Sequence, residues 1–85
     1  MRLDQWLWEV RIFHTRTRAA EAIKAGRVSA DCVVCKPAHE LKVGELVVVD
    51  FRGTERAWRV LGFPKSRIGA KLVAQFAEEV VYGAR

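Results

Sequence analysis

Basic side chains recur through residues 2–37 at spacings suited to binding phosphate. Because most of these positions fall at the ends of expected helices or in turns, a phosphate backbone can reach them. The aspartates of the chain are not paired, and its serines lack a histidine partner, so we expect no enzymatic activity. The pattern indicates RNA binding. The basic positions are Arg2, Arg11, Arg16, Arg18, Lys24, Arg27 and Lys36.

A second chemistry is suggested by the sequence CVVC at residues 32–35, which has the spacing of redox pairs and of half a zinc site. A redox pair normally opens a helix, whereas this one spans an expected turn and strand, where odd spacing points the sulfurs to opposite faces. Zinc needs two further ligands, and His14 and His39 lack motif spacing. We therefore expect a core role for Cys35, an exposed Cys32 and no cofactor or metal. A redox or zinc protein stays an alternative.

The charge of the chain is high and unevenly placed. The net charge is +5 and the isoelectric point is near 9.8, which is typical of nucleic-acid-binding domains. Anionic membranes also attract basic proteins, but no segment combines a lysine-lined face with a wide apolar face. No apolar run approaches the roughly 20 residues of a membrane span, and the N-terminus does not have the pattern of a signal peptide. We expect a cytoplasmic protein of one domain, residues 1–85, without a catalytic domain.

The spacing of apolar residues predicts a first helix that begins at Asp4, whose carboxylate would cap the first turn. Trp8 lies off the apolar stripe of this helix, and we favour its burial over a role in stacking on a base. The expected core stripe is Leu3, Trp6, Leu7, Val10 and Phe13.

Thr15 is the expected cap of a second helix over residues 16–25, which Gly26 ends in the left-handed conformation. The small apolar side chains of this helix predict close packing against the first. Arg16 and Arg18 fall in its first turn, where cations oppose the helix dipole. Their presence there is consistent with a phosphate ligand.

Strands are expected at residues 28–30, 33–35, 46–51 and 57–61, followed by a last helix over residues 70–81 that stops near Gly83. The fold class predicted is α+β, with two N-terminal helices packed on a small, mostly antiparallel twisted sheet of four to five strands and a C-terminal helix. The core motif spans 2–61 and the helical extension 65–83.

One ordered set of residues spans the core motif: R-L-D-x-W-L-W, then R, T-R, A, I-x-x-G-R-V, V-x-x-K-P and L-K-V-G-E-x-V. This order resembles the RNA-binding domain of the ribosomal protein S four type, also called the αL motif. Within that family, residues 6–8 and the short length resemble the ribosome-associated heat-shock branch and its relatives in ribosome quality control.

The resemblance implies a compact module whose first two helices and following hairpin bind structured RNA. It further implies binding to the large ribosomal subunit when a nascent chain on tRNA blocks it, with ribosomal RNA and/or tRNA as partners. Independently of the resemblance, we expect no membrane partner and a monomer when free. A helix-turn-helix protein that binds DNA stays an alternative. Gln5 stands where the family often has a basic residue, and Asp31-Cys32 replaces its usual Asn-Gly turn. The RNA-binding residues implied are Arg2, Gln5, Arg11, Thr15, Arg16, Thr17, Arg18, Arg27 and Lys36.

Overall fold

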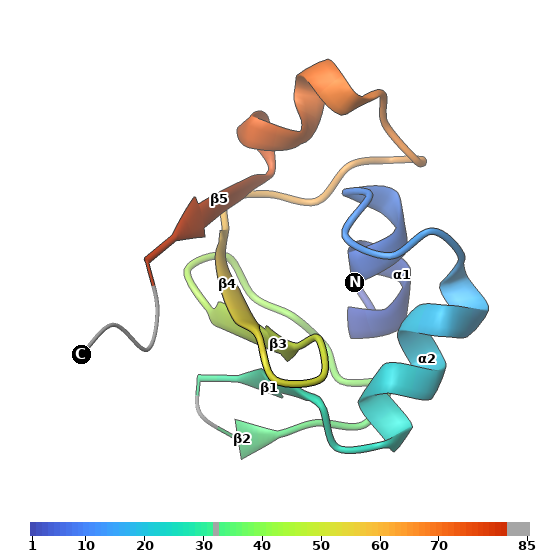
Figure 1. The fold of residues 1–85 in the computed structure, drawn as a ribbon. Coiled ribbons are helices and arrows are strands. Elements are labelled where there is room, and N and C mark those ends of the chain that lie inside the picture. Colours follow the sequence, from blue (N-terminus) through green and yellow to red (C-terminus); the bar gives the residue numbers. More distant parts are fainter. Residues whose placement is uncertain (32, 82–85) are drawn as a thin grey trace.

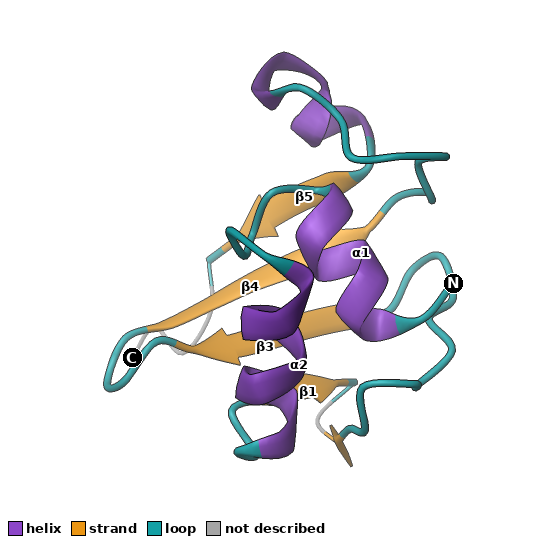
Figure 2. Cartoon of the chain, turned by 90° about the vertical axis from the view of Figure 1, so that its right-hand side faces the viewer, coloured by secondary structure: helices purple, strands orange, loops and turns teal. Residues whose placement is uncertain are grey.

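Two helices lie over one face of a five-stranded antiparallel sheet in the computed structural model, which describes residues 1–31 and 33–81 (Figures 1 and 2). The strand order is β2-β1-β3-β4-β5, so the predicted fold class is confirmed. The elements are α1 (Leu3–Glu9), α2 (Arg16–Lys24), β1 (Val28–Ala30), β2 (Val33–Val34), β3 (Leu46–Asp50), β4 (Glu55–Val60), the 3₁₀ helix η1 (Ala70–Gln75) and β5 (Ala77–Val80).

Helix α1 starts differently from the prediction. Asp4 lies inside the first turn and does not cap it, because its carboxylate accepts two hydrogen bonds from Arg2. The backbone N–H groups of Leu3 and Asp4 donate to the carbonyls of His39 and Pro37. A loop distant in sequence therefore satisfies the donors that a capping side chain would otherwise serve.

The apolar stripe that begins in α1 forms the centre of the core. Its four members from Leu3 to Val10 are 0–1% exposed, as predicted. The indole of Trp6 also donates to the carbonyl oxygen of Gly62 at 3.0 Å, which ties α1 to the chain after β4. The helix itself ends at Glu9, however, and Phe13 lies beyond it, only partly buried. Trp8 is half-buried beneath the guanidinium of Arg67, which lies 5.7 Å from the ring centroid.

The bounds of α2 confirm the prediction of a helix over residues 16–25 to within one residue. The hydroxyl oxygen of Thr15 accepts a hydrogen bond from the backbone N–H of Arg18 at 3.0 Å, and Gly26 takes the left-handed conformation with φ +78°. Ala19 and Ala22 are buried, and α2 packs against α1 as expected from these small side chains (Figure 2).

The hairpin after α2 is shorter than predicted. β1 pairs with β2 on one side and with β3 on the other, and β2 contains only Val33 and Val34, both largely exposed. Asp31 begins the expected turn with φ +50°, while position 32 lies outside the described residues. Cys35 is partly buried against the core, which agrees with the packing role expected for it.

The prediction of a C-terminal helix over residues 70–81 is wrong. Only 70–75 is helical, as the 3₁₀ helix η1, and β5 follows it directly and pairs with β4. The apolar spacing in this segment suits a helix, but the open edge of β4 offers backbone hydrogen-bond partners that a helix would leave unpaired. The Arg56 guanidinium on β4 joins the Glu79 carboxylate on β5 through two hydrogen bonds of 2.7 and 2.8 Å. The expected stop at Gly83 lies outside the described residues.

The three helices of the part of the chain that the structure describes are short. None combines the length and the apolar character that crossing a membrane requires.

Candidate nucleic-acid interface

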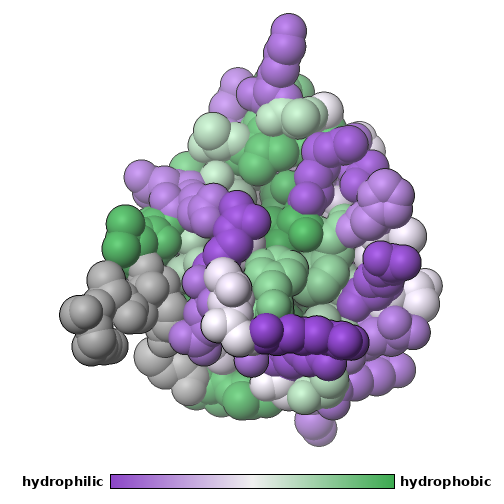
Figure 3. Space-filling view, in the orientation of Figure 1, coloured by the Kyte–Doolittle hydropathy of each residue, from purple (hydrophilic) through white to green (hydrophobic). Residues whose placement is uncertain are grey.

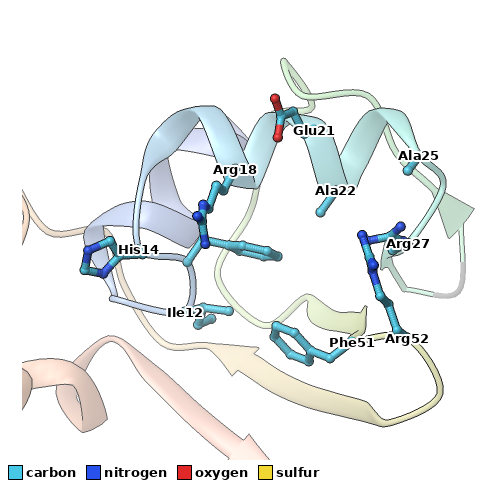
Figure 4. A pocket seen from close by; sticks show the side chains of 10 residues that line it. Ile12, His14, Arg18, Glu21, Ala22, Ala25, Arg27, Phe51 and Arg52 are labelled. Atoms are coloured by element: carbon cyan, nitrogen blue, oxygen red, sulfur yellow. The ribbon is translucent and has the colours of Figure 1, made fainter.

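A cavity of about 740 Å³ opens between α2 and the turn that joins β3 to β4 (Figure 4). Its floor is apolar and its border carries arginines. In the view of Figure 3, apolar surface lies between this turn and α2, with hydrophilic side chains along its border. The lining residues that carry the argument are Ile12, Phe13, Arg18, Arg27, Phe51 and Arg52.

Three arginines from separate elements meet at this cavity. Arg18 comes from the first turn of α2, Arg27 from the connection between α2 and β1, and Arg52 from the turn after β3. Figure 4 shows Arg18 on one side of the cavity and the other two on the opposite side. Local structure sets each position: Thr15 starts α2, Gly26 ends it just before Arg27, and the turn holds Arg52 in the left-handed region with φ +58°.

These three guanidinium groups differ from the other arginines. Among the described residues, none of the three forms an ion pair or donates a side-chain hydrogen bond within the protein. A guanidinium without a protein partner keeps its full set of donors for a phosphate or carboxylate ligand. Every other described arginine has a partner within the protein. Three form ion pairs with carboxylates: Arg2 and Arg16 with Asp4, and Arg56 with Glu79. Three donate hydrogen bonds to backbone carbonyls: Arg11 to Ile68, Arg59 to Gly44 and Arg67 to Trp8.

Two carboxylates lie near the cavity but do not neutralise it. Glu21 lines the cavity at the outer side of α2, and Figure 4 shows its carboxylate pointing away from Phe51. Asp50 lines a smaller recess of about 170 Å³, and its carboxylate accepts a hydrogen bond from the backbone N–H of Gly53 at 2.8 Å. The local charge therefore remains positive, which favours an anionic ligand.

Two aromatic rings form part of the apolar floor. The ring centroids of Phe13 and Phe51 lie 5.7 Å apart with the ring planes tilted by 31°. Trp58 packs against Phe51 in a T-shaped arrangement, with centroids 6.4 Å apart and planes at 81°. Phe51 is still 36% exposed, so part of its surface stays available to a ligand.

A second basic cluster lies at the start of α1. The Asp4 carboxylate is only 6% exposed and binds Arg2 at 3.0 Å and Arg16 at 3.7 Å, while each arginine side chain is about half exposed, 47% and 46%. One buried carboxylate thus orients two guanidinium groups and leaves the cluster with a net positive charge. Their remaining N–H groups face solvent.

Comparison with known proteins shows the family of the chain. The family model described as "S4 domain" matches residues 1–47. The chain belongs to the S4 domain family. Heat shock protein 15 homologues are similar to it, with 35% identity in Aeromonas salmonicida and 30% in Escherichia coli K12, each over 93% of this chain. The chain spans about 60% of the length of these relatives.

The fold of this S4 domain is also found in a solved structure. A trimeric structure of Vibrio cholerae heat shock protein 15 superimposes with a TM-score of 0.87 and 26% identity, over 94% of this chain and 81% of the other. The family expected from the sequence, including its likeness to the heat-shock branch, is thereby confirmed.

The structure divides the predicted site residues of this S4 domain into three groups. Arg18 and Arg27 line the cavity, and Arg2 and Arg16 join at Asp4. The remaining predicted residues lie outside both groups. Thr15 caps α2, Thr17 is exposed on it, Gln5 donates to Glu9, Arg11 donates to the Ile68 carbonyl, and Lys36 lies beside β2 and His39.

Several residues of the cavity are not among the predicted site residues, and Phe13, Phe51 and Arg52 are the ones that matter most for binding. From the sequence, Arg52 falls between two predicted strands, Phe13 belongs to the predicted core stripe and Phe51 is the last residue of the predicted strand at 46–51. The Phe51-Arg52-Gly53 sequence contains a signal, because sites for single-stranded nucleic acid combine basic side chains with aromatic rings on which bases stack. Only the tertiary fold places the β3–β4 turn across the cavity from α2 and so brings these side chains to the same cavity as Arg18.

The Cys35 thiol donates to the Val33 carbonyl oxygen at 3.2 Å. The pKa of the Cys35 thiol is raised, mainly by its partial burial and further by the nearby carboxylates of Glu45 and Asp31. The thiolate needed for nucleophilic or redox chemistry is therefore disfavoured at neutral pH. Within residues 1–31 and 33–81, no three side chains of the metal-ligating types gather at one place.

Proposed function

We propose that this S4 domain binds structured RNA and does not act as an enzyme. The observation that carries the proposal is the meeting of Arg18, Arg27 and Arg52, none with a protein partner among the described residues, around an aromatic floor. Phosphate contacts supply most of the affinity of nucleic-acid binding, and aromatic rings accept bases. The oriented pair at Asp4 would extend the contact along the RNA backbone.

Folded RNA suits this surface better than duplex DNA does. A helix-turn-helix protein inserts its second helix into the major groove. Here the arginines border a recess beside α2, and two of them, Arg27 and Arg52, do not belong to a helix. RNA is recognised largely through shape and through unpaired bases in loops and bulges, which a recess of this kind can receive.

The heat-shock relatives and the family resemblance support a finer proposal. We infer that the RNA is ribosomal RNA of the large subunit, together with tRNA when a nascent chain blocks that subunit, in the cytoplasm. The trimeric Vibrio cholerae relative favours an oligomer over the monomer expected from the sequence. Light scattering of the free protein, with and without RNA, distinguishes the two states.

The test of the proposed function compares ligands and a variant in one assay. The protein should co-sediment with ribosomal large subunits and should bind a folded ribosomal RNA fragment in preference to duplex DNA of the same length. The Arg16→Ala, Arg18→Ala variant should lose most of this binding while its melting temperature shows that it folds. A preference for duplex DNA, or co-sedimentation unaffected in the variant, would contradict the proposal.

A further inference from the structure

We propose that the cavity beside α2 takes up one unpaired nucleotide of the bound RNA. Its base would stack on Phe51, and its flanking phosphates would bind Arg18 on one side and Arg27 and Arg52 on the other. This inference rests on the proposed RNA binding and specifies which RNA element the surface selects.

The surroundings of Phe51 support a stacking role. A large aromatic side chain at the end of a strand normally turns into the core, yet this one is 36% exposed and lines the cavity. Trp58, itself only 5% exposed, packs against it in a T-shaped arrangement, and the Phe13 ring centroid lies 5.7 Å from that of Phe51. The ring is held by two neighbours and keeps part of its surface open, as in sites where bases stack on aromatic side chains.

The recess has an apolar part suited to a nucleobase and a cationic border suited to phosphate. Phe13, Ala22 and Phe51 supply the apolar part of a recess of about 170 Å³, and Arg27 and Arg52 lie at its border. Asp50 also lines the recess, and its carboxylate accepts a hydrogen bond from the backbone N–H of Gly53. A nucleobase is planar and largely apolar on its faces, whereas the adjoining phosphates are anionic. The same two arginines also line the larger cavity that Arg18 closes on the other side (Figure 4), so a phosphate can lie between guanidinium groups.

This geometry discriminates against fully paired RNA. The faces of paired bases are covered by their neighbours in the helix, so only a base in a bulge or loop can place its ring on Phe51. The arginines would still attract a regular helix by charge. The recess therefore adds a preference for an unpaired base to binding that is otherwise electrostatic.

The experiment uses a set of RNA hairpins that differ at one nucleotide. One member carries a single-nucleotide bulge, the second carries an abasic residue at the same bulge, and the third is fully paired, with the bulge tested at several positions of the stem. Wild-type protein should bind at least one bulged hairpin about 5- to 150-fold more tightly than its abasic counterpart, the range given by one base stacked on an aromatic side chain.

Two substitutions at Phe51 separate stacking from simple apolar contact. Phe51→Trp keeps an aromatic plane and should retain the preference for the bulged over the abasic hairpin. Phe51→Leu keeps apolar bulk without that plane and should abolish the preference. Melting temperatures of both variants show that they fold, and the readout is the ratio of two affinities of the same protein sample, which a partly unfolded fraction does not change.

The outcomes distinguish this inference from the proposed function. Equal wild-type affinity for bulged, abasic and paired hairpins would overturn the nucleotide pocket and leave RNA binding intact. Retention of the preference by Phe51→Leu would overturn stacking on this ring. Failure of the wild-type protein to bind any hairpin or ribosomal RNA would overturn the proposed function itself.

Discussion

Removing two of the arginines at the cavity should change how RNA affinity depends on salt. In the variant Arg18→Gln, Arg52→Gln, the side chains keep much of their length and polarity but lose two charges. Each neutralised phosphate contributes about 0.9 to the slope of log K against log salt for duplexes and about 0.7 for single strands. The variant should therefore lose about 1.4 to 1.8 units of slope.

The same numbers give the loss of affinity. If the ionic contribution vanishes near 1 M KCl, a slope difference of about 1.4 to 1.8 over one decade of salt corresponds to about 25- to 60-fold weaker binding at 0.1 M. Fluorescence anisotropy of a labelled ribosomal RNA hairpin between 0.1 and 1 M KCl measures both quantities. The curves of wild-type and variant protein should converge toward high salt.

A charge-matched control tests whether position matters. Lys42→Gln, Lys71→Gln removes the same net charge from exposed side chains that do not line the cavity. Lys71 lies in η1, which Figure 1 shows at the top of the molecule, away from the β3–β4 turn. This control should keep nearly the wild-type slope, because surface charges beyond the Debye length of about 10 Å at 0.1 M are largely screened. Equal losses of slope and affinity in the two variants would refute the reasoning, since net charge alone would then explain binding.

Three further predictions concern the framework that positions the site. Trp6→Phe removes the hydrogen bond to the Gly62 carbonyl and should lower the free energy of unfolding in urea by about 1–3 kcal/mol; an unchanged midpoint would contradict that role. Asp4→Asn leaves two guanidinium groups without their shared carboxylate and should also lower the free energy of unfolding in urea by about 1–3 kcal/mol. An unchanged free energy of unfolding would contradict a stabilising role of this cluster. The hydrogen bonds from Arg56 hold the pKa of Glu79 below its ordinary value of 4.5, so the stabilisation is complete above that pH and is lost as the pH falls through the folded-state value. Glu79→Gln should therefore flatten the acid side of the melting-temperature profile, and parallel profiles of the two proteins would count against the ion pair.

Much of the framework follows from local sequence signals. The Thr15 cap, the alanines of α2 and the Gly26 stop define that helix within a residue at each end, because caps and left-handed glycines act over only a few residues. The buried stripe of α1 is likewise visible in the spacing of its apolar residues.

The predictions from sequence are wrong where contacts with residues distant in the chain determine the local structure. The carbonyls of Pro37 and His39 accept hydrogen bonds from the first backbone N–H groups of α1. The Asp4 carboxylate therefore does not cap the helix and instead binds arginine side chains. Residues 77–80 pair with the edge of β4 as a strand, although the apolar spacing nearby suits a helix. Long-range backbone pairing of this kind overrides local preference and leaves little trace in a short window of sequence.

The sequence by itself determined that the chain is basic, folds as an α+β domain and resembles the S four family of RNA-binding domains. It also predicted Arg18 and Arg27 as RNA-binding residues, but it could not say which arginines remain without a protein partner. That depends on tertiary contacts such as the one between Arg11 and the Ile68 carbonyl, 57 residues away. Only the folded chain places the β3–β4 turn across the cavity from α2, so that Arg52 and Phe51 complete a recess whose floor is apolar and whose border is cationic.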